Sequence, residues 1–155
     1  MTTLSSQELE LIRFSLPHPT THTPQYTQSI PAPILLTYSA YAQRHLATAI
    51  ISSRRKPRKS KVPKTLATIP LLPHSATLLA LKHVLVFIKT VHGLPLLPSA
   101  TPFIRLTGLW TFAEAAGLYR TCLTLELPWP QVRLLDELRA VIGERPLTVE
   151  ERCIV

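Results

Sequence analysis

The sequence predicts a mainly α protein, a small bundle of four to five helices joined by Pro-rich connections, with α+β as the alternative. Three observations favour this fold class. The chain has 155 residues, the size of one domain, which we place at 1–155. Apolar residues recur at helical spacing in several segments. Most of the 15 prolines lie between those segments, and proline cannot continue a helix.

The first expected element is a short helix near the N-terminus. Ser5 and Glu8 have the S-x-x-E capping-box spacing that marks a helix start. Pro17 ends this helix near Phe14 to Leu16. Residues 17–33 then carry five prolines and show no apolar periodicity, so we expect a Pro-rich irregular segment there.

A second helix is expected over residues 34–52. Pro33 suits its first turn, and apolar side chains recur behind it at helical spacing. The basic run that follows, residues 54–64, contains Pro57 and Pro63 among closely spaced cations. Like charges repel one another and proline interrupts a helix, so this run is expected to be an exposed basic loop.

The most apolar segment predicts a central helix over residues 76–91. Ser75 is placed to cap its start, and Gly93 follows its end. Its polar side chains fall on one narrow stripe that contains Lys82 and Lys89, seven residues apart. The remaining surface of this helix should therefore form the core.

The C-terminal third predicts two more helices. The first opens after Thr101 and runs from Phe103 to about Tyr119. From there the pattern alternates with period two over residues 119–127, which indicates either one short β element or an irregular tail of the helix. The last clear helix is expected over 131–142, ending at Gly143, and Thr148 with Glu151 repeats the capping-box spacing.

The positive charge is concentrated in the middle of the chain. The net charge is +8, yet residues 11–113 contain no Asp or Glu, while they hold 12 of the 17 Lys and Arg and all six His. We therefore expect the basic run to bind a nucleic acid or a nuclear import receptor through Arg54, Arg55, Lys56, Arg58, Lys59, Lys61 and Lys64. Arg44, Lys82 and Lys89 could extend the same basic face.

Several partners suit a proline-broken basic run. It can act as a nuclear import signal, as a phosphate-binding arm or as a contact for an anionic membrane, and it can also serve only to keep an apolar protein from associating. No aromatic residue lies within 54–64 to stack on bases, so binding to nucleic acid would use phosphates and be independent of sequence. The apolar helices, with a mean hydropathy of +0.18 for the chain, could also meet a host protein partner or a peripheral membrane surface.

Enzymatic and metal chemistry find little support in the sequence. The four glycines are isolated, so there is no phosphate-cradling loop, and we expect no cofactor. His18 and His22 flank Pro19 without a nearby third ligand, so we expect no metal site. An enzyme would need distant residues to converge on a deep pocket lined by histidines.

The expected cellular compartment depends on three sequence features that the chain lacks: a disulfide framework, a signal peptide and a membrane span. Two cysteines, Cys122 and Cys153, are too few for a secreted disulfide framework. Glu8 and Glu10 interrupt the first apolar residues, which speaks against a signal peptide, and the lysines at 82 and 89 speak against a membrane span. We expect an intracellular protein of the nucleus or cytoplasm; its oligomeric state stays open.

No family motif is matched. The composition, rich in Pro, Thr, Leu and His and without Asn, resembles that of proteins read from a second frame of compact, C-rich viral genomes. This resemblance covers the whole chain and implies a small accessory or regulatory protein, not a housekeeping enzyme.

Overall fold

The computed structural model describes residues 11–46, 49–54, 64–95, 102–104, 111–129, 132–144 and 148–152. Within them a mixed β-sheet packs against helices, so the fold is α+β and the prediction of a mainly helical bundle is wrong. The strands are β1 (Leu11–Pro17), β2 (Pro24–Tyr26), β3 (Ile30–Pro31), β4 (Ile50–Arg54) and β5 (Lys64–Pro70). The helices are α1 (Ala32–Tyr38), α2 (Ala40–His45), α3 (Leu78–His92), α4 (Phe112–Thr124), α5 (Val132–Glu144) and α6 (Val149–Arg152).

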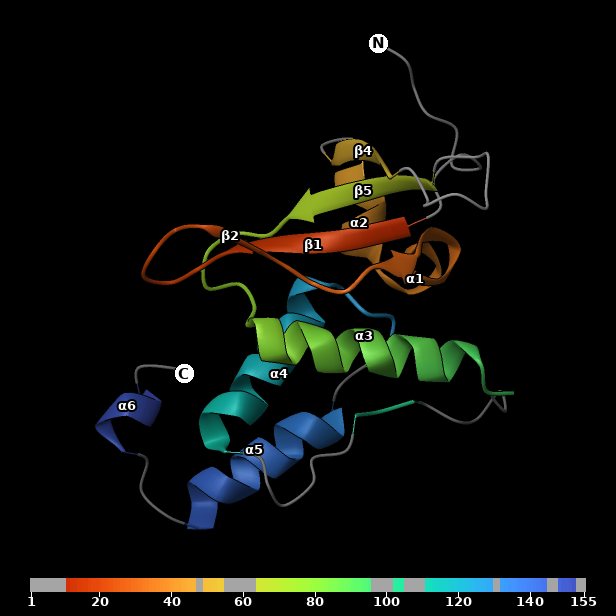
Figure 1. Cartoon of the computed structure of the whole chain (residues 1–155). Coiled ribbons are helices and arrows are strands. Elements are labelled where there is room, and N and C mark those ends of the chain that lie inside the picture. Colours follow the sequence, from red (N-terminus) through yellow and green to blue (C-terminus); the bar gives the residue numbers. More distant parts are fainter. Residues whose placement is uncertain are drawn as a thin grey trace.

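The sheet contains three antiparallel pairings and one parallel pairing (Figure 1). Its strand order is β2-β1-β5-β4, and β3 pairs with β1 along the same edge as β2. β4 and β5 are antiparallel, whereas β1 and β5 run parallel with Phe14 opposite Ile69. The carboxyl ends of β1 and β5 therefore lie at the same end of the sheet.

From Leu11 onward a strand replaces the expected N-terminal helix, whose proposed start at Ser5 and Glu8 lies outside the described residues. Along β1 the side chains of Ile12, Phe14 and Leu16 are buried, and the residues between them are only partly buried. This alternation has the period of a strand with one face on the core. The expectation of an irregular segment at 17–33 is also wrong in part, because β2 and β3 lie within it and return along β1.

A β-bulge separates β2 from β3. Ser15 is opposite Tyr26 while Ile12 is opposite Ile30, so the returning strand contains one residue more than β1 over this stretch. Thr27 lies in the bulge and is almost fully buried. Its hydroxyl oxygen accepts a hydrogen bond from the Phe14 N–H at 2.9 Å, and its own N–H donates to the Phe14 carbonyl at 3.0 Å.

The helix predicted over 34–52 is divided into α1, α2 and β4. Ser39 marks the first break, because its extended backbone ends α1 and its hydroxyl oxygen accepts a hydrogen bond from the Ala42 N–H at the start of α2. The second break comes before Ile50. Residues Ile50–Arg54 pair with β5 instead.

The central helix is confirmed as α3. Thr77 caps it instead of Ser75, and Gly93 is its C-cap with an ordinary right-handed φ of −84°. The buried side of α3 carries Ala80, Leu81, Val84, Leu85, Ile88 and Val91. Most of these side chains pack in one core with the buried face of β1 and with Ala67 and Ile69 of β5.

The expected β element at 119–127 is wrong. Residues up to Thr124 belong to α4, in which Leu118 and Cys122 are buried, and Leu125 just beyond the helix is buried as well. These spacings of four and three are helical, so the period-two pattern was coincidental. α4 begins after Thr111, later than expected, with a complete capping box formed by Thr111 and Glu114. The helix expected over 131–142 is confirmed as α5, although Gly143 lies inside it. A short helix that was not predicted, α6, follows the capping-box spacing of Thr148 and Glu151.

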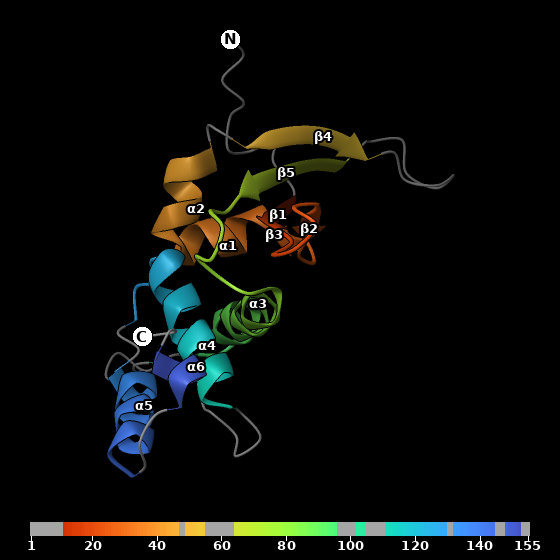
Figure 2. The ribbon, with the colours of Figure 1, turned by 90° about the vertical axis from the view of Figure 1, so that its left-hand side faces the viewer.

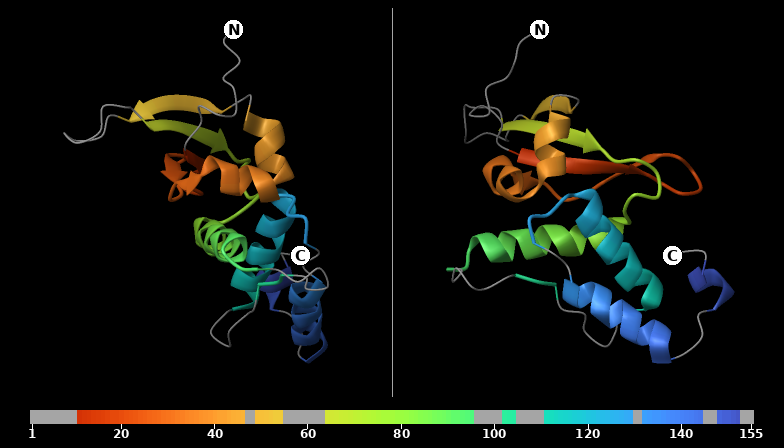
Figure 3. Two further views of the ribbon diagram at one scale, coloured as in Figure 1. Left: turned by 90° about the vertical axis from the view of Figure 1, so that its right-hand side faces the viewer. Right: turned by 180° about the vertical axis from the view of Figure 1, so that it is seen from behind.

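The elements form successive layers. Figure 2 shows the sheet at one end of the molecule, α3 beneath it, and α4 and α5 farther away; Figure 3 shows the same order from two other sides. α1 contacts both β1 and α3, and α3 packs on α4, which in turn packs on α5. The edge strand β4 lies on the far side of the sheet from α3.

Candidate functional site

The two ends of the basic run lie opposite each other in the sheet. Arg54 is the last residue of β4, Lys64 is the first residue of β5, and the two are register partners. The run is therefore not a loop throughout, because its first and last residues belong to strands. Arg55, Lys56, Arg58, Lys59 and Lys61 lie outside the described residues.

The three residues expected to extend the basic face lie in two different places. Arg44 belongs to α2 and forms an ion pair with Glu126, just beyond α4, so a carboxylate partly neutralises it. Lys82 and Lys89 belong to α3 and line a cleft together with residues of the β2 region. That cleft borders the sheet edge opposite β4.

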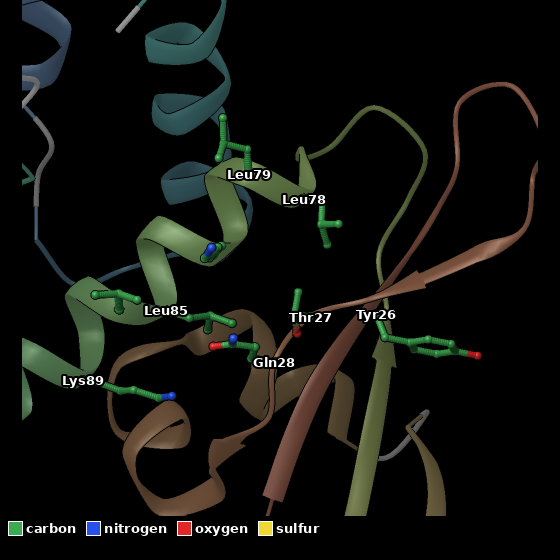
Figure 4. Close-up of a pocket in the computed structure, with 9 residues that line it drawn as sticks. Tyr26, Thr27, Gln28, Leu78, Leu79, Leu85 and Lys89 are labelled. Carbon is green, nitrogen blue, oxygen red and sulfur yellow. The ribbon is translucent and has the colours of Figure 1, made fainter. Parts of the chain in front are cut away.

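This cleft, which we call the β2–α3 cleft, is open and mainly apolar (Figure 4). Its volume is about 500 Å³, and it is lined by Tyr26, Thr27, Gln28, Leu78, Leu79, Lys82, Leu85, Val86 and Lys89. Leu79 and Val86 are 45% and 53% exposed, although they are apolar. In Figure 4, Leu85 and Lys89 extend from α3 toward the segment that carries Thr27 and Gln28.

Local sequence explains how the two walls arise. Residues seven apart in a helix lie two turns apart on nearly one face, which places Lys82 and Lys89 in a row along α3. The opposite wall is the bulge, where the hydrogen bonds between Thr27 and Phe14 hold the strand. The Tyr26 ring turns away from α3 and lies 4.0 Å beneath the guanidinium of Arg13, whose Nε–H donates to the Thr68 hydroxyl oxygen at 3.0 Å.

A second cleft brings together residues from four parts of the chain. It has a volume of about 260 Å³ and lies at the carboxyl ends of β1 and β5. We call it the histidine cleft, because His18, His22 and His74 line it together with Arg120 of α4. The sequence singled out His18 and His22 only as weak metal candidates, and nothing in the sequence pointed to His74 as their neighbour.

The shifted pKa values of Cys122, Tyr41 and Glu114 have structural causes. Burial raises the pKa of the Cys122 thiol to about 12, so this cysteine is a poor nucleophile. Burial also raises the pKa of Tyr41, while Arg44 lowers it and Glu126 raises it by smaller amounts. Hydrogen bonds from the Thr111 backbone and hydroxyl lower the pKa of Glu114, as a capping box requires.

Neither a metal cluster nor a membrane-spanning helix occurs in the described part of the chain. Among those residues, no group of three or more His, Cys, Asp or Glu is placed to hold a metal ion. No helix formed by them is long and apolar enough to cross a membrane.

Comparison with known proteins found no counterpart: no family model matches the chain, and no curated protein or solved structure is significantly similar to it.

Proposed function

We propose that this chain is a non-enzymatic accessory protein that binds nucleic-acid phosphates through the basic run at residues 54–64. One observation carries the proposal: seven cations lie in a run whose ends, Arg54 and Lys64, occupy one rung of an antiparallel strand pair. Pairing in the sheet holds both ends of the run at one place. The surrounding residues 11–113 contain no carboxylate that could compete with phosphate for these cations.

Electrostatics predicts the character of this binding. A protein that neutralises phosphates releases condensed counterions, so log affinity falls linearly with log salt concentration. Each phosphate contact contributes about 0.9 to that slope for duplex DNA and about 0.7 for single strands. Without aromatic residues in 54–64, the affinity should vary little with base sequence.

Two variants that lose the same charge test the proposal. Arg55→Gln/Lys56→Gln removes two cations from the basic run, and Lys82→Gln/Lys89→Gln removes two from α3. Binding of a labelled single-stranded RNA is measured over a range of salt concentrations. We expect the slope to fall by about 1.4 in the first variant and to stay unchanged in the second. Equal slopes in both variants would contradict the proposal.

Nuclear import is the competing role for the same residues. If Arg55→Gln/Lys56→Gln leaves RNA binding intact but moves the protein from the nucleus to the cytoplasm, the run is an import signal and the phosphate proposal is wrong.

The β2–α3 cleft favours a second binding role, with an acidic amphipathic segment of a partner protein. Several apolar side chains of α3 line the cleft together. A contiguous exposed apolar patch marks an interaction site, whereas a single exposed leucine does not. Lys82 and Lys89 lie about 10 Å apart along the helix, two turns of 1.5 Å rise per residue. The lining contains no carboxylate, so the charge of the cleft complements an acidic segment.

Charge complementarity gives this second role a direct test. A designed helical peptide of Leu and Glu should bind, whereas its Leu and Lys counterpart should not. Val86→Asp, in the cleft, should weaken binding of the Leu and Glu peptide by about tenfold or more. Leu123→Asp replaces another exposed apolar residue, on α4, and should have no effect. Binding to phosphatidylserine vesicles without binding to either peptide would identify a membrane contact instead.

A further inference from the structure

The face of the sheet that turns away from α3 carries an exposed aromatic ring. In β1, Phe14 belongs to the core that includes α3, and side chains alternate along a strand, so Arg13 lies on the other face. Thr68 is opposite Arg13 in the register of β1 with β5. Tyr26 is opposite Ser15, which shares a face with Arg13 because it is two residues farther along β1. We call this side of the sheet, with Arg13, Thr68 and Tyr26, the outer face.

The two ends of the basic run occupy positions of the same face. Lys64 lies four residues before Thr68 in β5, which is an even separation, and Arg54 is the register partner of Lys64 in β4. Pro70, at the other end of β5, is level with Tyr26 across β1. Six residues of strand separate Lys64 from Pro70, a length of about 20 Å. The basic run and the exposed ring therefore lie at opposite corners of one surface.

The Tyr26 ring is held from one side only. The Arg13 guanidinium lies 4.0 Å from the ring centroid and covers that side. Thr68 holds Arg13 in turn, because the Arg13 Nε–H donates to the Thr68 hydroxyl oxygen at 3.0 Å. Tyr26 is still 48% exposed, and Figure 4 shows its ring directed away from α3. An aromatic ring that is fixed on one side and exposed on the other can stack on a nucleic-acid base.

The surroundings of this ring favour a polyanion. Within the described part of the chain, Arg13 contacts Thr68 and Tyr26 and forms no ion pair with a carboxylate. Its terminal nitrogens can therefore donate to a phosphate, and hydrogen bonds between guanidinium and phosphate are charge-assisted. Leu66 and Thr68 are buried although they belong to the outer face, so the exposed part of this face is at the β2 edge, around Tyr26.

We propose that a single-stranded nucleic acid lies across the outer face, with its phosphates on the basic run and on Arg13 and one base stacked on Tyr26. This inference rests on the proposed function, because the basic run supplies most of the phosphate contacts. Every base has a π face, so stacking adds affinity without strong sequence preference. Single strands present unstacked bases to aromatic side chains, whereas a duplex does not. The site should therefore prefer single strands.

Replacing the ring tests this inference. Tyr26→Leu removes the ring and keeps an apolar side chain, whereas Tyr26→Trp keeps an aromatic ring. Binding of a labelled single-stranded RNA of about eight nucleotides to the full chain is measured over a range of salt concentrations. We expect Tyr26→Leu to bind about fivefold or more weakly at every salt concentration, with an unchanged salt slope, because stacking is lost and the phosphate contacts remain. Tyr26→Trp should bind at least as tightly as the wild type.

A polyanion without bases is the matched control. Inorganic polyphosphate should bind equally well to the wild type and to Tyr26→Leu. If Tyr26→Leu weakens RNA and polyphosphate equally, or if Tyr26→Trp binds as weakly as Tyr26→Leu, the ring has only a structural role and the inference is wrong. An equal loss of affinity for duplex and single-stranded RNA in Tyr26→Leu would also overturn it.

The failure of this inference differs from the failure of the proposed function. If Tyr26→Leu binds RNA like the wild type while Arg55→Gln/Lys56→Gln lowers the salt slope, the basic run binds phosphates and the outer face takes no base. If Tyr26→Leu weakens RNA alone while Arg55→Gln/Lys56→Gln leaves the slope unchanged, the outer face stacks on bases and the phosphate proposal for the basic run is wrong.

Discussion

Ser39 and Leu125 are 86 residues apart in the sequence, and a buried hydrogen bond joins them: the Ser39 hydroxyl donates to the Leu125 carbonyl oxygen at 2.8 Å. The same hydroxyl oxygen accepts from the Ala42 N–H at 3.1 Å, so one side chain both caps α2 and satisfies the end of α4. Beside this bond, Arg44 and Glu126 form an ion pair between the same two parts of the chain. Ser39 thus connects the helices next to the sheet with the helical layer beyond α3.

Replacing Ser39 with Ala should lower the free energy of unfolding by about 1–3 kcal/mol, because the buried Leu125 carbonyl loses its donor and α2 loses its cap. Urea denaturation measures the change. Ser75→Ala is the matched control, since the Ser75 hydroxyl donates to the Leu72 carbonyl in an exposed turn. An equal loss in both variants would contradict the special role of Ser39.

Thr27 should tolerate only a residue that keeps its hydroxyl. Thr27→Val preserves the shape but leaves the buried Phe14 N–H without its acceptor, so we expect a loss of about 1–3 kcal/mol. Thr27→Ser keeps the acceptor and should cost less. Thermal unfolding of the two variants compares them, and a more stable Val variant would show that this hydrogen bond contributes nothing.

The capping box of α4 predicts a stability difference that depends on pH. The pKa of Glu114 is lowered in the folded protein, so its contribution is present above the ordinary glutamate pKa and is lost as the pH falls through the folded pKa. Glu114→Gln should therefore lower the urea midpoint at about pH 7 and lower it less at about pH 3. Glu137→Gln, on the exposed side of α5, should show no such trend.

Cys122 should resist modification in the folded protein. Its pKa rises from 9.0 to about 12 through burial, so the thiolate fraction near pH 8 falls about a thousandfold. In a Cys153→Ser background, a disulfide reagent should react with Cys122 at the rate of an exposed thiol only when urea has unfolded the protein. The folded state also keeps this proton longer than the unfolded state, so stability should decrease as the pH rises above 9.0. Rapid labelling without urea would contradict the buried position.

Gly117 should be replaceable with a gain in stability. A Cβ at this position of α4 would lie 3.7 Å from the Thr77 side chain, which is an ordinary contact. Ala loses less backbone entropy than Gly in a helix, so Gly117→Ala should raise the free energy of unfolding by about 0.5–1 kcal/mol. Gly143→Ala, which meets no atom within 4 Å near the end of α5, should gain less. A destabilised Gly117→Ala would indicate closer packing against Thr77.

Local periodicity predicted the elements that one pattern dominates. α3 is apolar on all but one stripe, and α5 is clearly amphipathic, so both were found close to their observed bounds. β1 was missed because Leu11 and Ile12 are both apolar, which hides the alternation around Phe14, and because a capping-box spacing precedes it. β4 was missed because its register depends on β5, on the far side of the basic run.

The candidate sites depended on partners that no local pattern reveals. The row formed by Lys82 and Lys89 could be seen from their spacing, but the wall opposite them exists only because a bulge in the returning strand places Thr27 there. His74 joins His18 only through the parallel pairing of β1 with β5. Pairing between distant strands is a tertiary property, and it overrides local propensity.

The parallel pairing of β1 with β5 also determines the order of assembly. The β1–β2 and β4–β5 pairs each close over a short stretch of chain, and such local pairs form quickly. β1 can pair with β5 only after β5 has been synthesised, because β2, β3, α1, α2 and β4 all lie between these two strands in the sequence. The slow step of folding should therefore be the docking of two preformed hairpins, with the buried side of β1 exposed to other chains until then.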